Sequence, residues 1–153
     1  MFKEASPGYE NAPVVMIQGH MDMVCEKNEG VEHDFDKDPI DMILEDGILR
    51  ADGTTLGADD GAGVAYMLAV LDDATIAHPA LECLFTVQEE TTMEGAMQID
   101  PAKISARRLI NVDSEKQNFS ITSSCGGTDW YVCKDVEEKE VNKEGYKLVI
   151  NGL

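Results

Sequence analysis

Most side chains in this sequence that could do chemistry are acidic, and they stand where short apolar segments end. The set contains one histidine and five carboxylates: His20, Asp22, Asp59, Glu89, Glu90 and Asp113. Carboxylates crowded together in a low-dielectric site repel one another strongly. A divalent cation would reverse that penalty, because carboxylate and imidazole groups are its natural ligands. The residue types therefore predict a metal site, provided that the fold brings them together.

The spacing within two pairs predicts a division of roles. Residues two apart in an extended strand point the same way. Asp22 can therefore accept a hydrogen bond from one ring nitrogen of His20 and leave the other nitrogen for a metal. Adjacent residues such as Glu89 and Glu90 point to opposite sides of a strand. One glutamate could then ligate a metal while the other stays free as the base that a metal-activated water needs.

Apolar runs and periodic segments predict the elements that would position these residues. Val14–Ile17, Leu81–Val87 and Leu109–Val112 are predicted to form buried strands. Ala62–Leu71 has the spacing of a helix, and a second helix is predicted to start within Gly95–Ile99. Strands that alternate with helices indicate an α/β fold with a mixed, mostly parallel sheet flanked by helices. Ligands bind beyond the carboxyl ends of such strands, which is where the acidic residues stand.

Other segments predict peripheral elements. Asp46-Gly47 lies between two apolar stretches and predicts a hairpin over Met42–Ala51. Phe119–Thr122 and Trp130–Val136 are predicted to be later, more exposed strands. The charge-rich stretch Asp135–Gly145 is predicted to be a linker between domains.

Composition excludes several classes of protein. The 153 residues carry 12 basic and 30 acidic side chains, a net charge of −18, which argues against partners such as nucleic acid or an anionic membrane. Hydrophobic residues make up 43% of the chain, enough for a core. The 4 cysteines form no C-x-x-C pair and are predicted to be free, mostly buried thiols, typical of a cytoplasmic protein.

Each acidic pattern also has an ordinary structural explanation. A histidine and an aspartate two residues apart often share only a surface hydrogen bond. Two adjacent glutamates are usually solvated, and Asp59-Asp60 could simply cap a helix, where anions are favoured. The coincidence of four such patterns at successive element ends favours a metal site over four separate structural features.

A calcium-binding loop is a competing interpretation of one acidic segment. Asp34, Asp36, Asp38 and Glu45 match positions 1, 3, 5 and 12 of the loop template. Position 6 is Pro39, where the sharp turn of that loop needs glycine. The sequence therefore argues against a calcium loop.

The motifs around the acidic residues resemble those of a known family. Four segments, in this order, resemble those of the co-catalytic zinc exopeptidases of the aminoacylase/carnosinase group. They are GHMDMV (Gly19–Val24), TTLGADDG (Thr54–Gly61), TVQEE (Thr86–Glu90) and INVDSE (Ile110–Glu115). HDFDKDPI, residues 33–40, resembles the Xaa-His dipeptidase subgroup, also called aminoacyl-histidine dipeptidase or peptidase D. The resemblance extends over essentially all of residues 7–153.

This resemblance implies a role for each candidate residue. His20, Asp59 and Asp113 would hold a first metal, and Asp59 would bridge to a second metal that Glu90 also ligates. Asp22 would orient His20. Glu89 would be the general base and acid. The resemblance also implies a cis peptide bond between Asp59 and Asp60.

The implied activity is hydrolysis of dipeptides with a free amino terminus, with histidine as the usual second residue in the subgroup. The implied cofactor is Zn²⁺ at two sites, although Mn²⁺ and Co²⁺ are compatible with these ligands. The implied partners are a small peptide substrate and, in full-length relatives, a second copy in a homodimer built through a lid domain.

The sequence departs from this family in ways that limit the expected activity. The second metal of the family also needs a later histidine, but none of the 3 histidines lies after His78. Residues 1–137 are expected to be a partial catalytic metallopeptidase domain, and residues 138–153 a linker and the first strand of a truncated lid. The isolated chain is therefore expected to be weakly active or inactive. An acidic protein that binds divalent metal without turnover remains the alternative.

Overall fold

The computed structural model describes residues 1–114, 118–123, 126, 131, 133–135, 137, 140, 142, 144–146 and 149. The chain divides into two units, Met1–Ser120 and Ile121–Leu153. All the helices and strands named below belong to the first unit.

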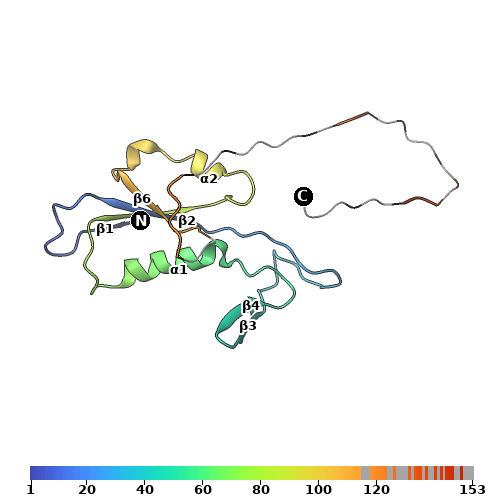
Figure 1. Ribbon diagram of the computed structural model, residues 1–153, viewed down its shortest axis with the longest axis horizontal. Coiled ribbons are helices and arrows are strands. Elements are labelled where there is room, and N and C mark those ends of the chain that lie inside the picture. Colours follow the sequence, from blue (N-terminus) through green and yellow to red (C-terminus); the bar gives the residue numbers. More distant parts are fainter. Residues whose placement is uncertain are drawn as a thin grey trace. The chain divides into compact units, whose positions relative to one another are not determined.

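A four-stranded sheet forms the centre of the first unit (Figure 1). Its order is β1 (Phe2–Lys3), β5 (Leu81–Thr86), β2 (Val15–His20) and β6 (Arg108–Asn111). β2 is parallel to both β5 and β6, whereas β1 is antiparallel to β5. The predicted α/β fold with a mixed, mostly parallel sheet is therefore confirmed. The carboxyl ends of β2, β5 and β6 meet at one edge of the sheet.

Helices lie on both faces of this sheet (Figure 1). The long helix α1 (Ala58–Asp72) packs against β2 on one face. The short helix α2 (Glu94–Met97) and a 3₁₀ turn (Pro101–Lys103) lie over the other face. Because α1 connects β2 to the parallel strand β5, it forms the crossover that such a connection requires.

A separate hairpin is inserted between β2 and α1. Its strands are β3 (Met42–Glu45) and β4 (Ile48–Ala51), which pair antiparallel. The two turn residues Asp46 and Gly47 have φ of 51° and 78°. Turns of two residues with positive φ match the twist of the flanking strands, and Asp-Gly is a preferred sequence for them. The predicted hairpin is confirmed.

Helix and sheet pack closely where α1 lies against β2. Met67 of α1 is fully buried, and Asp60 is only 3% exposed. A Cβ atom added to Gly19 or Gly63 would collide with the Asp60 carboxylate, and at Gly63 also with Val112. Two glycines therefore make the space in which a buried aspartate is held between helix and sheet.

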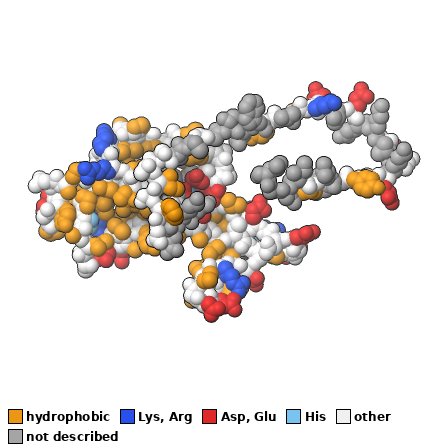
Figure 2. Space-filling view, viewed as in Figure 1, with side chains coloured by type: hydrophobic (Ala, Val, Ile, Leu, Met, Phe, Trp, Pro, Cys, Tyr) orange, Lys and Arg blue, Asp and Glu red, His pale blue; other side chains and the backbone are white. Residues whose placement is uncertain are grey.

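The described part of the chain has a small core and a broad apolar surface. The buried apolar residues are Met16, Met67, Leu81, Cys83 and Ala106. Many other large apolar side chains are exposed, and Figure 2 shows hydrophobic atoms spread over the surface around the sheet. No described helix is both long and apolar enough to span a membrane.

Several predicted boundaries differ from the observed ones. The structure starts the first helix at Ala58 rather than Ala62, but Asp59 and Asp60 have non-helical backbone angles. The regular helix thus begins close to the predicted position. The second helix is confirmed as a single turn, Glu94–Met97. The strand predicted over Phe119–Thr122 is wrong, since these residues form no strand. No described strand lies beside them to pair with.

Two further predictions concern burial. His78, expected at the surface with His33, is buried, and its Nδ1 lies 2.8 Å from the Pro79 carbonyl oxygen. The three described cysteines are free as expected, but only Cys83 is buried. The strand predicted over Trp130–Val136 falls largely outside the described residues.

The contact between α1 and β2 predicts opposite effects for two neighbouring glycines. Gly63→Ala places a methyl group against Asp60 and Val112, so we expect it to lower the free energy of unfolding by about 1–3 kcal/mol. Gly61→Ala meets no atom within 4 Å, so we expect a small stabilisation of about 0.5–1 kcal/mol. Urea unfolding of both variants tests this. Equal destabilisation by the two substitutions would contradict the packing described.

Candidate metal centre

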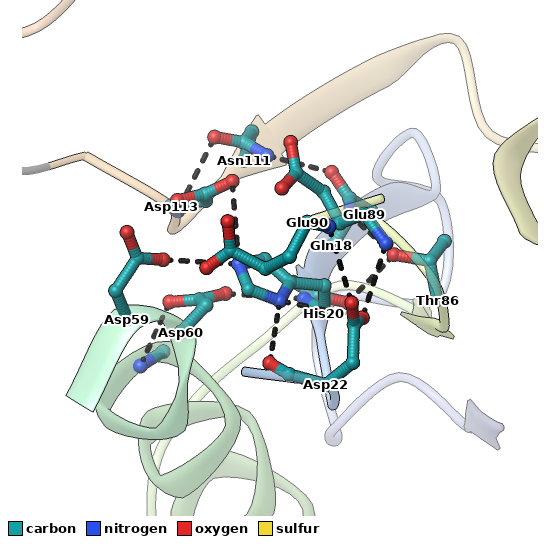
Figure 3. Close-up of polar contacts among 12 residues, drawn as sticks. Gln18, His20, Asp22, Asp59, Asp60, Thr86, Glu89, Glu90, Asn111 and Asp113 are labelled. Carbon is teal, nitrogen blue, oxygen red and sulfur yellow. Dashed lines mark hydrogen bonds and ion pairs between the residues drawn. The ribbon is translucent and has the colours of Figure 1, made fainter. Parts of the chain in front are cut away.

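A buried histidine lies at the centre of the candidate site (Figure 3). His20 is the last residue of β2 and is 1% exposed. Its Nδ1 lies 2.9 Å from the backbone carbonyl oxygen of Asp22. Its Nε2 lies 2.9 Å from Oδ1 of Asp59 and 3.9 Å from Oδ2 of Asp113. The ring is thus fixed on one side and faces carboxylates on the other.

These contacts determine the protonation of His20 in the absence of metal. The Asp22 carbonyl oxygen can only accept and an ionised Asp59 carboxylate does so too, so a proton on each ring nitrogen satisfies both hydrogen bonds. Burial alone would lower the pKa of His20, but the hydrogen bond to Asp59 and the charge of Asp113 raise it above its ordinary value. A metal bound at Nε2 would take the place of one proton, while Nδ1 continues to donate to Asp22.

The Asp22 carboxylate makes different contacts from those predicted. Since β2 ends at His20, the alternation of a strand does not continue to Asp22. Its two oxygens accept the backbone N–H groups of Glu89 and Glu90, each at 3.1 Å, and Oδ1 lies 3.5 Å from His20 Nδ1. Burial would raise the pKa of Asp22, but these N–H donors hold it below its ordinary value. Asp22 therefore joins the loop after β5 to the end of β2.

The structure brings all six predicted site residues together. Ligand atoms of His20, Glu89 and Asp113 lie within 4.8 Å of one another, and so do those of His20, Asp59 and Glu90. Both glutamates thus belong to the cluster, whereas the spacing argument left one of them apart from the metal ligands. The chain turns at Gln88, which has a φ of 59°, directly before the two glutamates.

The carboxylates of this cluster repel one another. Burial, together with the charge of Asp59, raises the pKa of Asp113 from 3.8 to about 6. Burial and the charges of Asp59 and Glu89 also raise the pKa of Glu90. One imidazole nitrogen and several carboxylate oxygens form a donor set that suits Zn²⁺, Mn²⁺ or Co²⁺. The residues present therefore fit a transition-metal ion, which would neutralise their repulsion.

Asp60 is a residue of this region that the sequence argument missed. One carboxylate oxygen accepts the backbone N–H of His20 and the other that of Gly63, each at 3.2 Å. The Asp59–Asp60 peptide bond is cis, as the resemblance implied. Asp60 ties the start of α1 to the end of β2 and so places Asp59 beside the imidazole. The signal in the sequence was an aspartate directly before two closely spaced glycines.

These pKa shifts predict that the metal-free chain loses stability as the pH rises. A carboxyl whose folded pKa is raised destabilises the fold as the pH rises from its unfolded to its folded value, so the contribution of Asp113 is lost between pH 3.8 and about 6. A histidine whose pKa is raised by folding stabilises the fold at any pH below its ordinary pKa. This contribution of His20 is lost as the pH rises through its pKa in the folded chain. Both groups therefore lower the stability as the pH rises, Asp113 between pH 3.8 and about 6 and His20 above pH 6.5.

Thermal unfolding in the presence of a chelator measures this effect. We expect Tm at pH 8 to be lower than at about pH 4.5 by roughly 5 °C. The variant Asp113→Asn removes one of the titrating groups and should reduce the difference. A Tm that is equal at both pH values, or higher at pH 8, would contradict the electrostatic account of the cluster.

Comparison with known proteins places this site in a family. The model of peptidase family M20/M25/M40 matches residues 16–135. The cytosol non-specific dipeptidase of Escherichia coli is 41% identical over 153 residues, which cover 99% of this chain and 32% of that protein.

Solved structures show the same relationship. The aminoacylhistidine dipeptidase of Vibrio alginolyticus matches with a TM-score of 0.73 at 44% identity, over 76% of this chain and 24% of that one. An aminopeptidase from Bacillus cereus matches with a TM-score of 0.58 at 31% identity, over 75% of this chain and 29% of that one.

The chain spans about a third, or less, of the length of these relatives. The family match nevertheless includes every residue of the cluster around His20. The resemblance seen in the motifs is thus confirmed: this chain belongs to the metal-dependent peptidase family M20/M25/M40.

Proposed function

We propose that this chain provides the metal centre and the general base of a zinc-dependent dipeptidase. The observation that carries the proposal is the convergence of carboxylates from three other segments on Nε2 of a buried histidine. A metal-independent fold would gain nothing from this arrangement, because burial and the neighbouring carboxylates raise the pKa of Asp113 and of Glu90.

The proposed ligands are those that the family resemblance implies, and the clustering of these side chains around His20 supports them. His20, Asp59 and Asp113 would hold the first metal, and Asp59 with Glu90 the second. A bound zinc ion polarises a carbonyl group and lowers the pKa of water. His20 remains oriented through Nδ1, which is held by the Asp22 carbonyl oxygen.

Glu89 is the proposed general base. Its carboxylate lies within 4.8 Å of the ligand atoms of His20 and Asp113, and its backbone N–H is anchored on Asp22. Glu89 would take a proton from the attacking water and pass it to the amine that leaves when the peptide bond breaks. Asp22 would keep the loop that carries Glu89 at a fixed distance from His20.

The substrate class follows from the relatives. Two of them are named as a dipeptidase and an aminoacylhistidine dipeptidase, so we propose dipeptides, including those with a C-terminal histidine. We also propose a cytoplasmic location, because the Escherichia coli relative is a cytosolic protein. The division into residues 1–137 and 138–153, and a homodimer of the whole protein, remain predictions.

Zinc calorimetry on the 153-residue chain tests the metal site. We expect a specific site whose affinity falls more than about 100-fold in His20→Ala and in Asp59→Ala, beyond the loss typical of groups that do not touch the metal. Asp34→Ala, in the exposed acidic segment, should change the affinity less than about twofold. A diffuse acidic metal binder would respond alike to all three substitutions, and that result would favour the alternative without enzymatic activity.

Hydrolysis of an alanyl-histidine dipeptide by the zinc-loaded chain tests the chemistry. We expect turnover below about 1 s⁻¹, against a typical value of about 10 s⁻¹. The reason is that His20 is assigned to the first metal, which leaves only Asp59 and Glu90, among the described residues of that cluster, as ligands of the second metal. Glu89→Gln should abolish this activity and leave the zinc affinity nearly unchanged. Turnover that survives Glu89→Gln would overturn the role of Glu89. Fast turnover by the unmodified chain that is lost in Glu89→Gln would support that role and contradict only the expected low rate.

A further inference from the structure

A chain of side-chain hydrogen bonds crosses three strands beside the metal centre (Figure 3). The backbone N–H of Asp113 donates to Asn111 Oδ1 at 3.2 Å, and Asn111 Nδ2 donates to Gln18 Oε1 at 2.6 Å. Gln18 Nε2 then donates to Thr86 Oγ1 at 3.1 Å, and that hydroxyl donates to the Gly19 carbonyl oxygen at 3.3 Å. The chain therefore links β6, β2 and β5 at their carboxyl ends.

The two backbone ends of this chain fix the orientation of both amides. The Asp113 N–H can only donate, so Asn111 must present its oxygen there and its NH₂ group to Gln18. The Gly19 carbonyl can only accept, so the Thr86 hydroxyl must donate to it and accept from Gln18. Rotating either amide by 180° would place two donors or two acceptors against each other. Each link thus depends on the next.

The position of this chain follows from where the sheet ends. The last backbone hydrogen bond between β6 and β2 runs from Val112 N–H to the Gln18 carbonyl oxygen at 3.0 Å. The amide of the next residue, Asp113, donates to the Asn111 side chain. Asn111 therefore fixes the backbone one residue beyond the last hydrogen bond to β2. That residue is Asp113, whose carboxylate lies 3.9 Å from His20 Nε2.

The same residues line a cavity of about 220 Å³ beside the cluster. Gln18, Thr86 and Asn111 line it together with Glu89 and Asp113. This cavity lies on the face of the sheet that α2 covers. Asp60 and Gly63 support the site from the opposite face, which α1 covers. The cluster is thus held from two sides, by Asp60 on one and by the amide chain on the other.

We infer that Asn111 and Gln18 are positioning residues for Asp113, which fix the backbone of this carboxylate so that it meets a metal at His20. The inference rests on the proposed function, since it assigns Asp113 as a metal ligand. Neither amide contacts the metal site directly, and both act through the Asp113 backbone.

Zinc calorimetry on a double-mutant cycle tests this inference. The four proteins are the 153-residue chain, Asn111→Leu, Asp113→Ala and the double variant. Leucine has nearly the size of asparagine but neither accepts nor donates a hydrogen bond. We expect Asn111→Leu to weaken zinc binding about tenfold, as for other groups that orient a metal ligand. In the Asp113→Ala background the same substitution should have no further effect, because its target is gone.

A matched control separates positioning from general destabilisation. Gln98 is an exposed amide that donates to Glu94, and Gln98→Leu should leave the zinc affinity unchanged. Thermal unfolding of each metal-free variant reports any loss of structure. A purely structural role of Asn111 would lower Tm and would weaken zinc binding equally with and without Asp113.

The outcomes separate the inference from the proposed function. Normal zinc affinity in Asn111→Leu, or a loss that persists in Asp113→Ala, would overturn the inference and leave the metal site standing. Failure of the unmodified chain to bind zinc at all would overturn the proposed function and the inference together. A tenfold loss that disappears in the Asp113→Ala background supports the inference.

Discussion

The arrangement around His20 depends on one electrostatic constraint: a buried imidazole surrounded by carboxylates needs a positive charge at Nε2. Without a metal only a proton could supply that charge; burial opposes it, but the hydrogen bond to Asp59 and the charge of Asp113 raise the pKa of His20. A metal ion would supply it more effectively, because it interacts with several carboxylates at once rather than with one hydrogen-bond partner. Burial and the charge of Asp59 raise the pKa of Asp113 even though the charge of His20 lowers it.

The acidic residues of this region fall into two groups with different tasks. Asp22 and Asp60 direct their oxygens at backbone N–H groups and connect chain segments. Asp59, Glu90 and Asp113 face the imidazole and are available to a cation. The first group provides the rigidity that the second requires, because mutually repelling carboxylates would otherwise move apart. Asp22 and Asp60 differ in pKa because burial outweighs the hydrogen bonds at Asp60 but not at Asp22.

Much of the site was predictable because its residues stand at the ends of strongly apolar strands. Parallel pairing of β2 with β5 and β6 brings those ends to one edge, so His20, Glu89 and Asp113 could be expected together. The contacts of Asp60 and Gln18 could not be predicted, since they depend on how closely α1 approaches β2 and on the register between strands. The error at Phe119–Thr122 has a similar origin, because an apolar alternating run becomes a strand only beside a partner.

The central claim is that His20 Nε2 and the carboxylates around it hold a metal ion. Diffraction from crystals of the zinc-loaded chain, with data collected on both sides of the zinc absorption edge, locates the ion directly. The account predicts an anomalous peak about 2.0–2.2 Å from His20 Nε2 and from a carboxylate oxygen of Asp59 and of Asp113. Zinc found on the exposed Cys25 thiol or in the acidic segment around Asp34, with none at His20, would contradict it.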